Sequence, residues 1–165
     1  MEIETKEELD RFYERPDPWD FQATKDDHTR RMIIARTAGM FAPALGRTLD
    51  IGAGEGWITC ALPGRELHGL ELSDRAASRF PYRVKRVLEP DGSYDLVVCS
   101  GVLYRHYDCG LCLEWIRKSS LKFVLTCHIK TWEIEEISSI GREIFMAEFP
   151  YREYVQKLRV FEVGK

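Results

Sequence analysis

Apolar and polar positions follow a helical spacing near the start of the chain and a strand-like pattern from residue 48 onward. Apolar residues on one helical face predict a short helix over 6–15, a longer one over 26–41 and a third over 108–119. Short apolar runs, typical of parallel strands buried on both faces, predict five strands, over 48–51, 66–70, 83–87, 94–100 and 122–127.

Two segments after the fifth strand alternate between apolar and polar residues. They cover 143–149 and 156–163, and this alternation predicts an antiparallel pair. The linker over 88–93 is too short for a crossover helix, so part of the helical layer must be missing. The order of elements therefore predicts an α/β fold with a mostly parallel sheet, trimmed helices and a C-terminal antiparallel hairpin.

Prolines separate the first two helices. Pro16 and Pro18 fix their own backbone angles and restrict the residues before them, so the segment 16–21 is not helical. Trp19 lies between these prolines and Phe21. A rigid aromatic in such a segment can cover a bound ligand and exclude water, so we predict an ordered lid that carries Trp19.

Glycines follow the first predicted strand at alternate positions. The sequence from residue 48 reads Thr-Leu-Asp-Ile-Gly-Ala-Gly-Glu-Gly, and Glu71 ends the next strand. Without a Cβ, glycine lets the backbone turn tightly and lets a ligand lie against the main chain. A carboxylate about 20 residues after such a turn binds ribose hydroxyls in doubly wound sheets, so the pattern predicts an adenosine ligand.

The spacing of the glycines and the charge of the turn favour one adenosine ligand. A dinucleotide fingerprint needs a third glycine where this chain has Trp57. Asp50 and Glu55 also place negative charge beside the turn, which repels a pyrophosphate and suits a cationic sulfonium. We therefore predict S-adenosylmethionine as the cofactor.

Composition and charge narrow the class of protein. With 165 residues and 44% hydrophobic content we expect one domain, in which 1–47 form N-terminal helices and the lid and 48–165 form the sheet core. A net charge of −3 does not favour nucleic acid as the main partner. The chain has no apolar run long enough to span a membrane and no signal-like start, so we expect a cytoplasmic protein.

Five cysteines lie mostly in apolar patterns, which predicts reduced, buried thiols. Cys109 and Cys112 have the spacing of a zinc pair, with His106 and His128 as conceivable further ligands. A second cysteine pair or a paired histidine motif is missing, so we predict no metal site.

The glycine-rich segment from Leu49 to Gly56 resembles the first motif of class I S-adenosylmethionine-dependent methyltransferases. This resemblance implies a Rossmann-like, mostly parallel seven-stranded sheet and covers nearly the whole chain. The sequence Ser-Gly-Val-Leu-Tyr over 100–104, together with Asp17-Pro18-Trp19, is also similar to nodulation-type N-methyltransferases that act on amino sugars.

The resemblance implies roles for individual residues. The glycine turn would meet the methionine part of the cofactor, Glu71 the ribose, Leu72 the adenine face and Glu89 the adenine amino group. Arg30 or Arg31 could bind the methionine carboxylate, because a guanidinium offers a bidentate fork. The predicted cofactor-binding residues are Trp19, Arg30, Arg31, Asp50, Gly52, Ala53, Gly54, Glu71, Leu72, Glu89 and Ser100.

Two residues after the fourth strand are candidates for the catalytic step. Tyr104 follows the carboxyl end of a strand, where ligands bind in open α/β sheets, and His106 could act as a base near neutral pH. Methyl transfer from a sulfonium needs mainly in-line positioning, so a base is not obligatory.

These observations predict a methyltransferase that acts on the nitrogen or oxygen of a small polar acceptor. Two alternatives remain open. An RNA or protein methyltransferase could use the basic segments 28–31 and 83–86 as its contact surface, and a non-catalytic module could keep the fold and the cofactor. The oligomeric state is not predicted.

Overall fold

One mixed sheet forms the centre of the molecule. The computed structural model describes residues 5–42, 46–103 and 107–164. The strand order is β3-β2-β1-β4-β5-β7-β6, and β7 runs antiparallel to both its neighbours. The strands are β1 (Arg47–Ile51), β2 (Glu66–Leu70), β3 (Val84–Val87), β4 (Tyr94–Ser100), β5 (Ser120–Ile129), β6 (Arg142–Tyr151) and β7 (Tyr154–Glu162). This topology is that of the class I methyltransferase fold and confirms the predicted fold.

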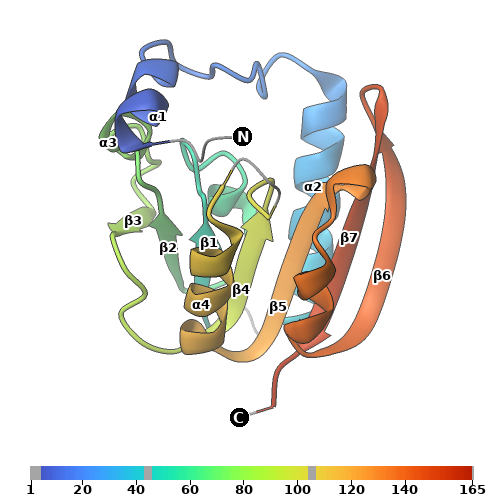
Figure 1. Cartoon of the computed structure of the whole chain (residues 1–165). Helices are drawn as coiled ribbons and strands as arrows, with labels where there is room; N and C mark the ends of the chain where they lie inside the picture. Colours follow the sequence, from blue (N-terminus) through green and yellow to red (C-terminus); the bar gives the residue numbers. More distant parts are fainter. Residues whose placement is uncertain (1–4, 43–45, 104–106, 165) are drawn as a thin grey trace.

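Helices cover both faces of the sheet (Figure 1). The helix α2 (Lys25–Phe41) and the turn η1 (Thr59–Ala61) lie on one face, and α4 (Cys109–Ser119) and η3 (Glu135–Ser139) lie on the other. Successive residues of β4 supply both cores, since Leu96 and Val98 pack in the first and Val97 and Cys99 in the second. The central strands are therefore buried on both faces, as their continuous apolar runs predict.

The helical layer is reduced. Between β1 and β2 the only regular element is η1, and after β2 the helix α3 (Asp74–Ala77) has four residues. No helix separates β3 from β4. These observations agree with the predicted trimming, although the sequence analysis did not foresee η1 or α3.

Capping side chains begin the two N-terminal helices. Thr5 and Glu8 form a reciprocal capping box at α1 (Lys6–Phe12), and the Thr24 hydroxyl accepts a hydrogen bond from the Asp27 N–H at the start of α2. The chain between them crosses above the carboxyl ends of the strands (Figure 1). The segment 16–21, predicted as a lid, is thus held between two capped helices, α1 and α2.

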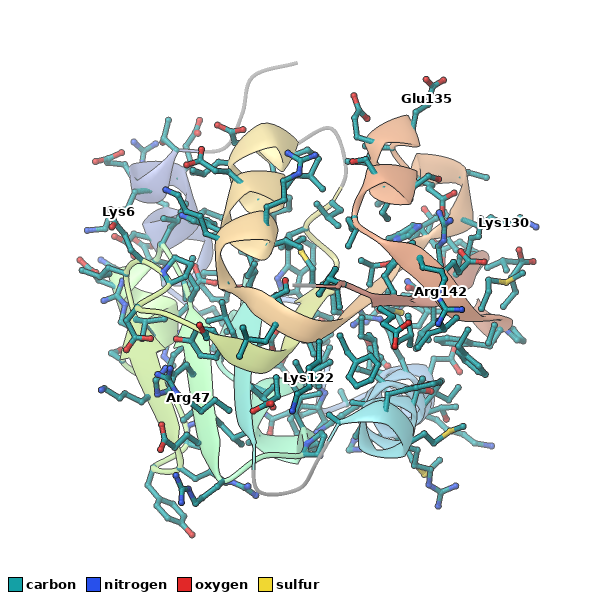
Figure 2. All side chains as sticks on the ribbon, turned by 90° about the horizontal axis from the view of Figure 1, so that it is seen from below. Lys6, Arg47, Lys122, Lys130, Glu135 and Arg142 are labelled. Atoms are coloured by element: carbon teal, nitrogen blue, oxygen red, sulfur yellow. The ribbon has the colours of Figure 1, made fainter. Side chains whose placement is uncertain are left out.

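Ion pairs close the opposite edge of the sheet, seen from below in Figure 2. Arg47 forms ion pairs with Glu66 and Asp91 at 3.1 and 3.0 Å, and its guanidinium lies 4.7 Å from the ring centre of Tyr94. Lys122 pairs with Asp95 at 2.8 Å. These charged side chains pair with one another, so they are not available to bind a ligand at this edge. A ligand site is therefore expected at the opposite edge, where the carboxyl ends of the strands lie.

Candidate cofactor and acceptor site

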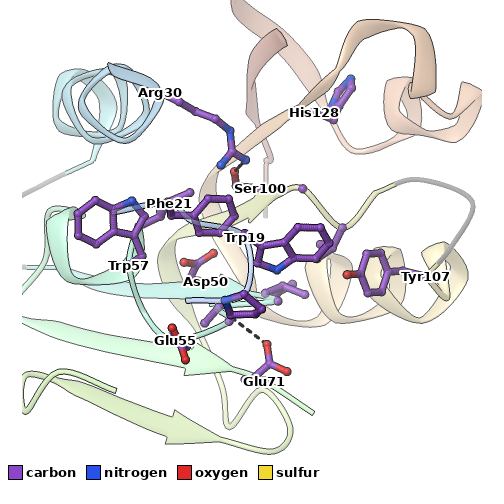
Figure 3. Close-up of a pocket in the computed structure, with 18 of the residues that line it drawn as sticks. Trp19, Phe21, Arg30, Asp50, Glu55, Trp57, Glu71, Ser100, Tyr107 and His128 are labelled. Atoms are coloured by element: carbon purple, nitrogen blue, oxygen red, sulfur yellow. Dashed lines mark hydrogen bonds between the residues drawn. The ribbon is translucent and has the colours of Figure 1, made fainter. Parts of the chain in front are cut away.

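A cavity of about 630 Å³ lies at the carboxyl ends of the strands, below the 13–24 segment. The glycine turn, the end of β2, the start of α4, the lid and the turn between β6 and β7 all contribute to its wall. The exposed surface of its lining is mainly apolar, and polar side chains also contribute to the wall, among them Arg30, Asp50, Glu71 and His128 (Figure 3). Such a composition is typical of sites for small ligands.

The glycine turn has a backbone conformation that other residues rarely adopt. Gly52 has φ +73° and Gly54 has φ +56°. A Cβ on Gly52 would lie 2.2 Å from Val102 Cγ1, and one on Gly54 would lie 3.0 Å from the Tyr13 hydroxyl oxygen. Glycine is therefore required at Gly52 by both conformation and space.

Glu71 joins the end of β2 to this turn. One carboxylate oxygen accepts a hydrogen bond from the Gly54 N–H and the other from the Ser73 N–H, both at 2.8 Å. Burial raises the pKa of Glu71, while these two N–H groups act in the opposite direction. Figure 3 shows the carboxylate directly beneath the turn, at the bottom of the cavity. Each oxygen keeps a lone pair for a ligand hydroxyl.

Asp50 is the most deeply buried acid of the site. Its Oδ2 accepts a hydrogen bond from the Thr59 hydroxyl at 2.6 Å, and its exposed fraction is 2%. Burial raises the pKa of Asp50 to about 7, and the field of Arg30 works against this rise. Asp50 is therefore a mixture of protonated and ionised forms near neutral pH.

The two adjacent arginines of α2 have different surroundings. Arg30 is buried, lines the cavity and donates from Nη2 to the Ser100 hydroxyl at 2.5 Å. Arg31 is not part of the cavity wall, because its guanidinium stacks 4.2 Å from the ring centre of Trp57 and donates to Cys60 Sγ. The helix thus directs Arg30 inward and Arg31 onto Trp57.

Arg30 has no carboxylate within ion-pair distance among the described residues. The Nε atoms of both Arg30 and Arg31 lack a hydrogen-bond partner there. The charge of Arg30 acts on Asp50, and its guanidinium lies 5.5 Å from the ring centre of Tyr151. An anionic ligand group in the cavity could pair directly with this guanidinium.

The lid is anchored at its beginning by Glu55. This carboxylate accepts a hydrogen bond from the Asp17 N–H at 2.9 Å and pairs with Arg79 at 2.6 Å. The charge of Glu55 is thus already compensated, and our argument that it favours a cationic ligand is weakened. Its observed role is to fasten the lid to the glycine turn.

Trp19 lies on the lid among other aromatic rings. Its ring centre is 4.6 Å from that of Phe12, and it stacks on Phe21 at 6.2 Å. The side chain lines the cavity and is 38% exposed. These contacts belong to the lid and α1, so Trp19 is not a core residue.

The turn between β6 and β7 fastens the far end of the lid. Arg152 donates from Nη2 to the Trp19 carbonyl oxygen at 3.0 Å and to Asp27 Oδ2 at 2.6 Å. The Tyr151 hydroxyl donates to the other Asp27 oxygen, also at 2.6 Å. The sequence analysis missed Asp27, Tyr151 and Arg152, since no local pattern links positions so far apart.

A second polar cluster lies where β5 ends. His128 lines the cavity on the side away from Glu71, and its Nε2 is 2.8 Å from Glu133 Oε2 (Figure 3). Glu133 also pairs with Lys157 at 3.0 Å. Sequence reasoning considered His128 only as a zinc ligand. Its place at the carboxyl end of a parallel strand was the signal that could have identified it as a site residue.

The remaining predicted residues divide into three groups. Ala53, Leu72 and Ser100 line the cavity. Glu89 does not, because it follows the end of β3 on the exposed return toward β4 and its charge acts on Lys118 in the last turn of α4. Tyr104 and His106 lie outside the described residues, so their catalytic roles stay predictions.

Three further observations concern nucleic-acid binding, metal binding and membrane-spanning helices. Arg30 is buried and Arg86 pairs with Asp74 at 2.7 Å, so neither presents an open charge within the basic segments 28–31 and 83–86. Among residues 5–42, 46–103 and 107–164, no three histidine, cysteine or acidic side chains gather as a metal site would require. No described helix has the length and apolarity to cross a membrane.

Solved structures match this fold over most of the chain. The N-methyltransferase NodS from Bradyrhizobium japonicum WM9, solved with S-adenosylhomocysteine, has a TM-score of 0.79 at 16% identity, covering 97% of this chain and 98% of NodS. The 1,6-didemethyltoxoflavin-N1-methyltransferase of Burkholderia thailandensis, with its substrate and S-adenosylhomocysteine bound, has a TM-score of 0.69 at 14% identity, covering 97% and 87%.

Another match is the [4+2]-cyclase SpnF, with a TM-score of 0.66 at 8% identity, covering 84% of this chain and 81% of SpnF. No family model matches the sequence, and no curated protein sequence matches it. At these identities the comparisons show a shared methyltransferase fold, and function must be argued from the site.

Proposed function

We propose that this protein is an S-adenosylmethionine-dependent methyltransferase that acts on the nitrogen or oxygen of a small acceptor. The observation that carries the proposal is the pair of charges at separate parts of one cavity. Glu71 lies beneath the glycine turn and can accept hydrogen bonds from ribose hydroxyls, while Arg30, which forms no ion pair with a described residue, can pair with a carboxylate. S-adenosylmethionine carries a ribose and a carboxylate in one molecule.

The glycine turn fits this ligand. Gly52 allows a ligand to lie against the backbone, and Leu72 offers an apolar surface for a base at the edge of the cavity. Two of the structurally similar proteins were solved with S-adenosylhomocysteine, which supports the same cofactor here. When bound, the cofactor would supply an electrophilic methyl group.

The chain itself contributes positioning and exclusion of water. Glu71 and Arg30 would hold two parts of the cofactor, and the lid over the cavity would keep water from the reacting atoms. A nucleophile held in line with the carbon–sulfur bond then needs little further assistance.

A small acceptor is favoured over RNA or protein. The lid and the β6–β7 turn cover the cavity and are joined by the Arg152 hydrogen bond to Trp19, which leaves the site suited to a ligand that can be enclosed. The burial of Arg30 and the pairing of Arg86 with Asp74 also reduce the charge that 28–31 and 83–86 offer to RNA. Measured methyl transfer distinguishes this function from a non-catalytic module and from a different reaction, such as that of the [4+2]-cyclase SpnF.

Calorimetry with S-adenosylhomocysteine tests the proposal, with NAD as the contrasting ligand. We expect S-adenosylhomocysteine to bind and NAD not to bind. Arg30→Met should weaken binding roughly 10- to 150-fold, the value of hydrogen bonds to a charged group, without lowering the melting temperature. Arg31→Met is the matched control and should leave binding unchanged. Binding of NAD alone, or equal effects of the two substitutions, would contradict the proposal.

A further inference from the structure

His128 is a buried histidine with one ring nitrogen bonded and the other free. It is 1% exposed, and it lies on β5 opposite Lys157 of β7. Its Nε2 is bonded to Glu133, whereas its Nδ1 is buried and has no hydrogen-bond partner among the described residues. It is one of six buried side-chain nitrogen or oxygen atoms without a partner among the described residues, and His128 lines the cavity. A catalytic role is one explanation for such an atom.

The surroundings of Glu133 determine which nitrogen carries the proton. Lys157 and Arg159 lie 3.0 and 3.4 Å from the same carboxylate oxygen, and Glu143 pairs with Arg159 on its other side. Burial would raise the pKa of Glu133, but the hydrogen bonds from Lys157 and His128 lower it below its ordinary value. The carboxylate is therefore ionised and accepts the Nε2 proton, which leaves Nδ1 with a free lone pair.

Burial also keeps this imidazole neutral. It lowers the pKa of His128, and the hydrogen bond with Glu133 offsets only part of the effect. A neutral imidazole with a fixed tautomer can accept a proton, and a carboxylate behind it stabilises the resulting cation.

Aromatic residues line the cavity on the side of His128, together with the polar Gln156, which is paired with Ile129 across β5 and β7. Trp132 lies four residues after His128, and its ring centre is 5.7 Å from that of Tyr154. On the lid, Trp19 and Phe21 stack nearly parallel. Aromatic faces of this kind pack best against a planar ligand.

We propose that the part of the cavity lined by His128, Ile129 and Trp132 binds the methyl acceptor. The acceptor is a planar heteroaromatic or phenolic compound with a neutral N–H or O–H. His128 Nδ1 accepts that hydrogen. The inference rests on the proposed methyltransferase function. The acceptor nitrogen or oxygen forms a bond to the methyl carbon, and the carbon–sulfur bond of the sulfonium donor breaks with its electron pair on sulfur. The acceptor proton moves to Nδ1, and Glu133 stabilises the imidazolium through Nε2.

Two substitutions at His128 separate the functions of its two nitrogens. His128→Gln places an amide near Nε2 and can keep the contact with Glu133, but nothing replaces Nδ1. His128→Asn places an amide near Nδ1, where it can accept a hydrogen bond but not a proton. Melting temperatures of both variants show whether the folded state is kept.

The first measurement is calorimetry with S-adenosylhomocysteine. We expect both variants to bind it as the parent does, because His128 lies away from Glu71 and the glycine turn. If the parent fails to bind, the proposed function itself is wrong. If only the variants fail, His128 belongs to the cofactor end and the present inference is wrong.

The second measurement is methyl transfer from S-adenosylmethionine to a panel of phenols, indoles and fused nitrogen heterocycles, with aliphatic amines and amino sugars as contrasting compounds. We expect turnover within the planar set, and none with planar compounds whose N–H or O–H is already methylated. His128→Gln should lower kcat about 100-fold or more, the usual contribution of a general base, and His128→Asn should lower it less.

Several results would overturn the inference while the proposed function survives. One is turnover of aliphatic amines or amino sugars in preference to the planar set. Another is that a protein that binds S-adenosylhomocysteine turns over no planar compound. A third is that His128→Gln is as active as the parent.

Discussion

The two ends of the cavity are assembled in different ways. At the cofactor end, the glycine turn and Glu71 come from β1, β2 and the loops that follow them, and a single carboxylate joins them. At the other end, His128 depends on Glu133 and Lys157, and the lid depends on Arg152 from the turn between β6 and β7. The glycine turn and Glu71 are encoded in a short continuous segment, to which α2 adds Arg30, whereas the second end requires the C-terminal hairpin to be in place.

This difference suggests how substitutions will divide. Changes at the cofactor end should affect ligand affinity and local backbone geometry together, because the same groups serve both. Changes at His128 and Glu133 should spare cofactor affinity, whereas changes in the lid, which covers the cavity, should reduce it. The four predictions that follow test this division, beginning with the largest effect.

Gly52→Ala should give the largest loss. The added Cβ would lie 2.2 Å from Val102 Cγ1 at a positive φ, so both the turn and the ligand surface must shift. We expect the S-adenosylhomocysteine dissociation constant to rise about 100-fold or more, together with a lower melting temperature. Gly39→Ala in α2 is the control, since a Cβ there meets no atom within 4 Å. It should leave affinity unchanged, and an equal response of the two variants would contradict the prediction.

Glu71→Ala should affect both binding and stability. Loss of hydrogen bonds to a charged group predicts a dissociation constant higher by roughly 10- to 150-fold. Because the Gly54 and Ser73 N–H groups also lose their acceptor, the melting temperature should fall. Glu89→Ala, outside the cavity wall, should change neither quantity. Calorimetry and thermal unfolding of both variants provide the test, and unchanged affinity in Glu71→Ala would remove the ribose assignment.

Trp19→Ala tests whether the lid serves both ends. The residue packs on Phe12 and Phe21 and is 38% exposed, so its loss should cost little stability. Aromatic contacts of about 0.5–1.5 kcal/mol predict a roughly 2- to 10-fold weaker binding of S-adenosylhomocysteine, with turnover reduced in parallel. Tyr82→Ala, at a fully exposed aromatic, is the control. A large loss of stability with unchanged affinity would instead assign Trp19 a structural role.

Asp50 should make stability depend on pH without ligand. Its pKa is raised to about 7 in the folded protein, against about 4 when unfolded. The raised pKa of Asp50 therefore stabilises the folded protein fully below about pH 4, and this stabilisation is lost as the pH rises toward 7. The free energy of unfolding falls by at most about 1.4 kcal/mol per pH unit. Asp50→Asn should lose this dependence. Unfolding of the parent and the variant between pH 5 and 7 provides the measurement, and parallel curves would refute the assignment.

Sequence reasoning succeeded where the pattern was local. Continuous apolar runs located the parallel strands, because a strand buried on both faces must be apolar throughout. The glycine turn was predicted from residues within one loop, and positive φ at Gly52 and Gly54 agrees with it. The resemblance to class I methyltransferases supplied the mostly parallel seven-stranded sheet, whereas the order of its strands comes from the structure.

Reasoning from sequence was less informative where function depends on tertiary pairing. Spacing did not distinguish Arg30 from Arg31, since the choice is made by Trp57 stacking on one and the cavity receiving the other. Glu89 was chosen from its distance along the chain, yet the short return after β3 carries it away from the site. The link between Asp27 and Tyr151 joins positions 124 residues apart, and no window of sequence contains it.

That link between the start of α2 and the turn after β6 has a consequence for the order of folding during synthesis. The N-terminal lid leaves the ribosome early, but Tyr151 and Arg152, which fasten its far end, emerge only after almost all of the sheet. The lid thus acquires its final position only when the hairpin closes. A nascent chain with β1 to β5 complete would have its glycine turn formed and its cavity still uncovered.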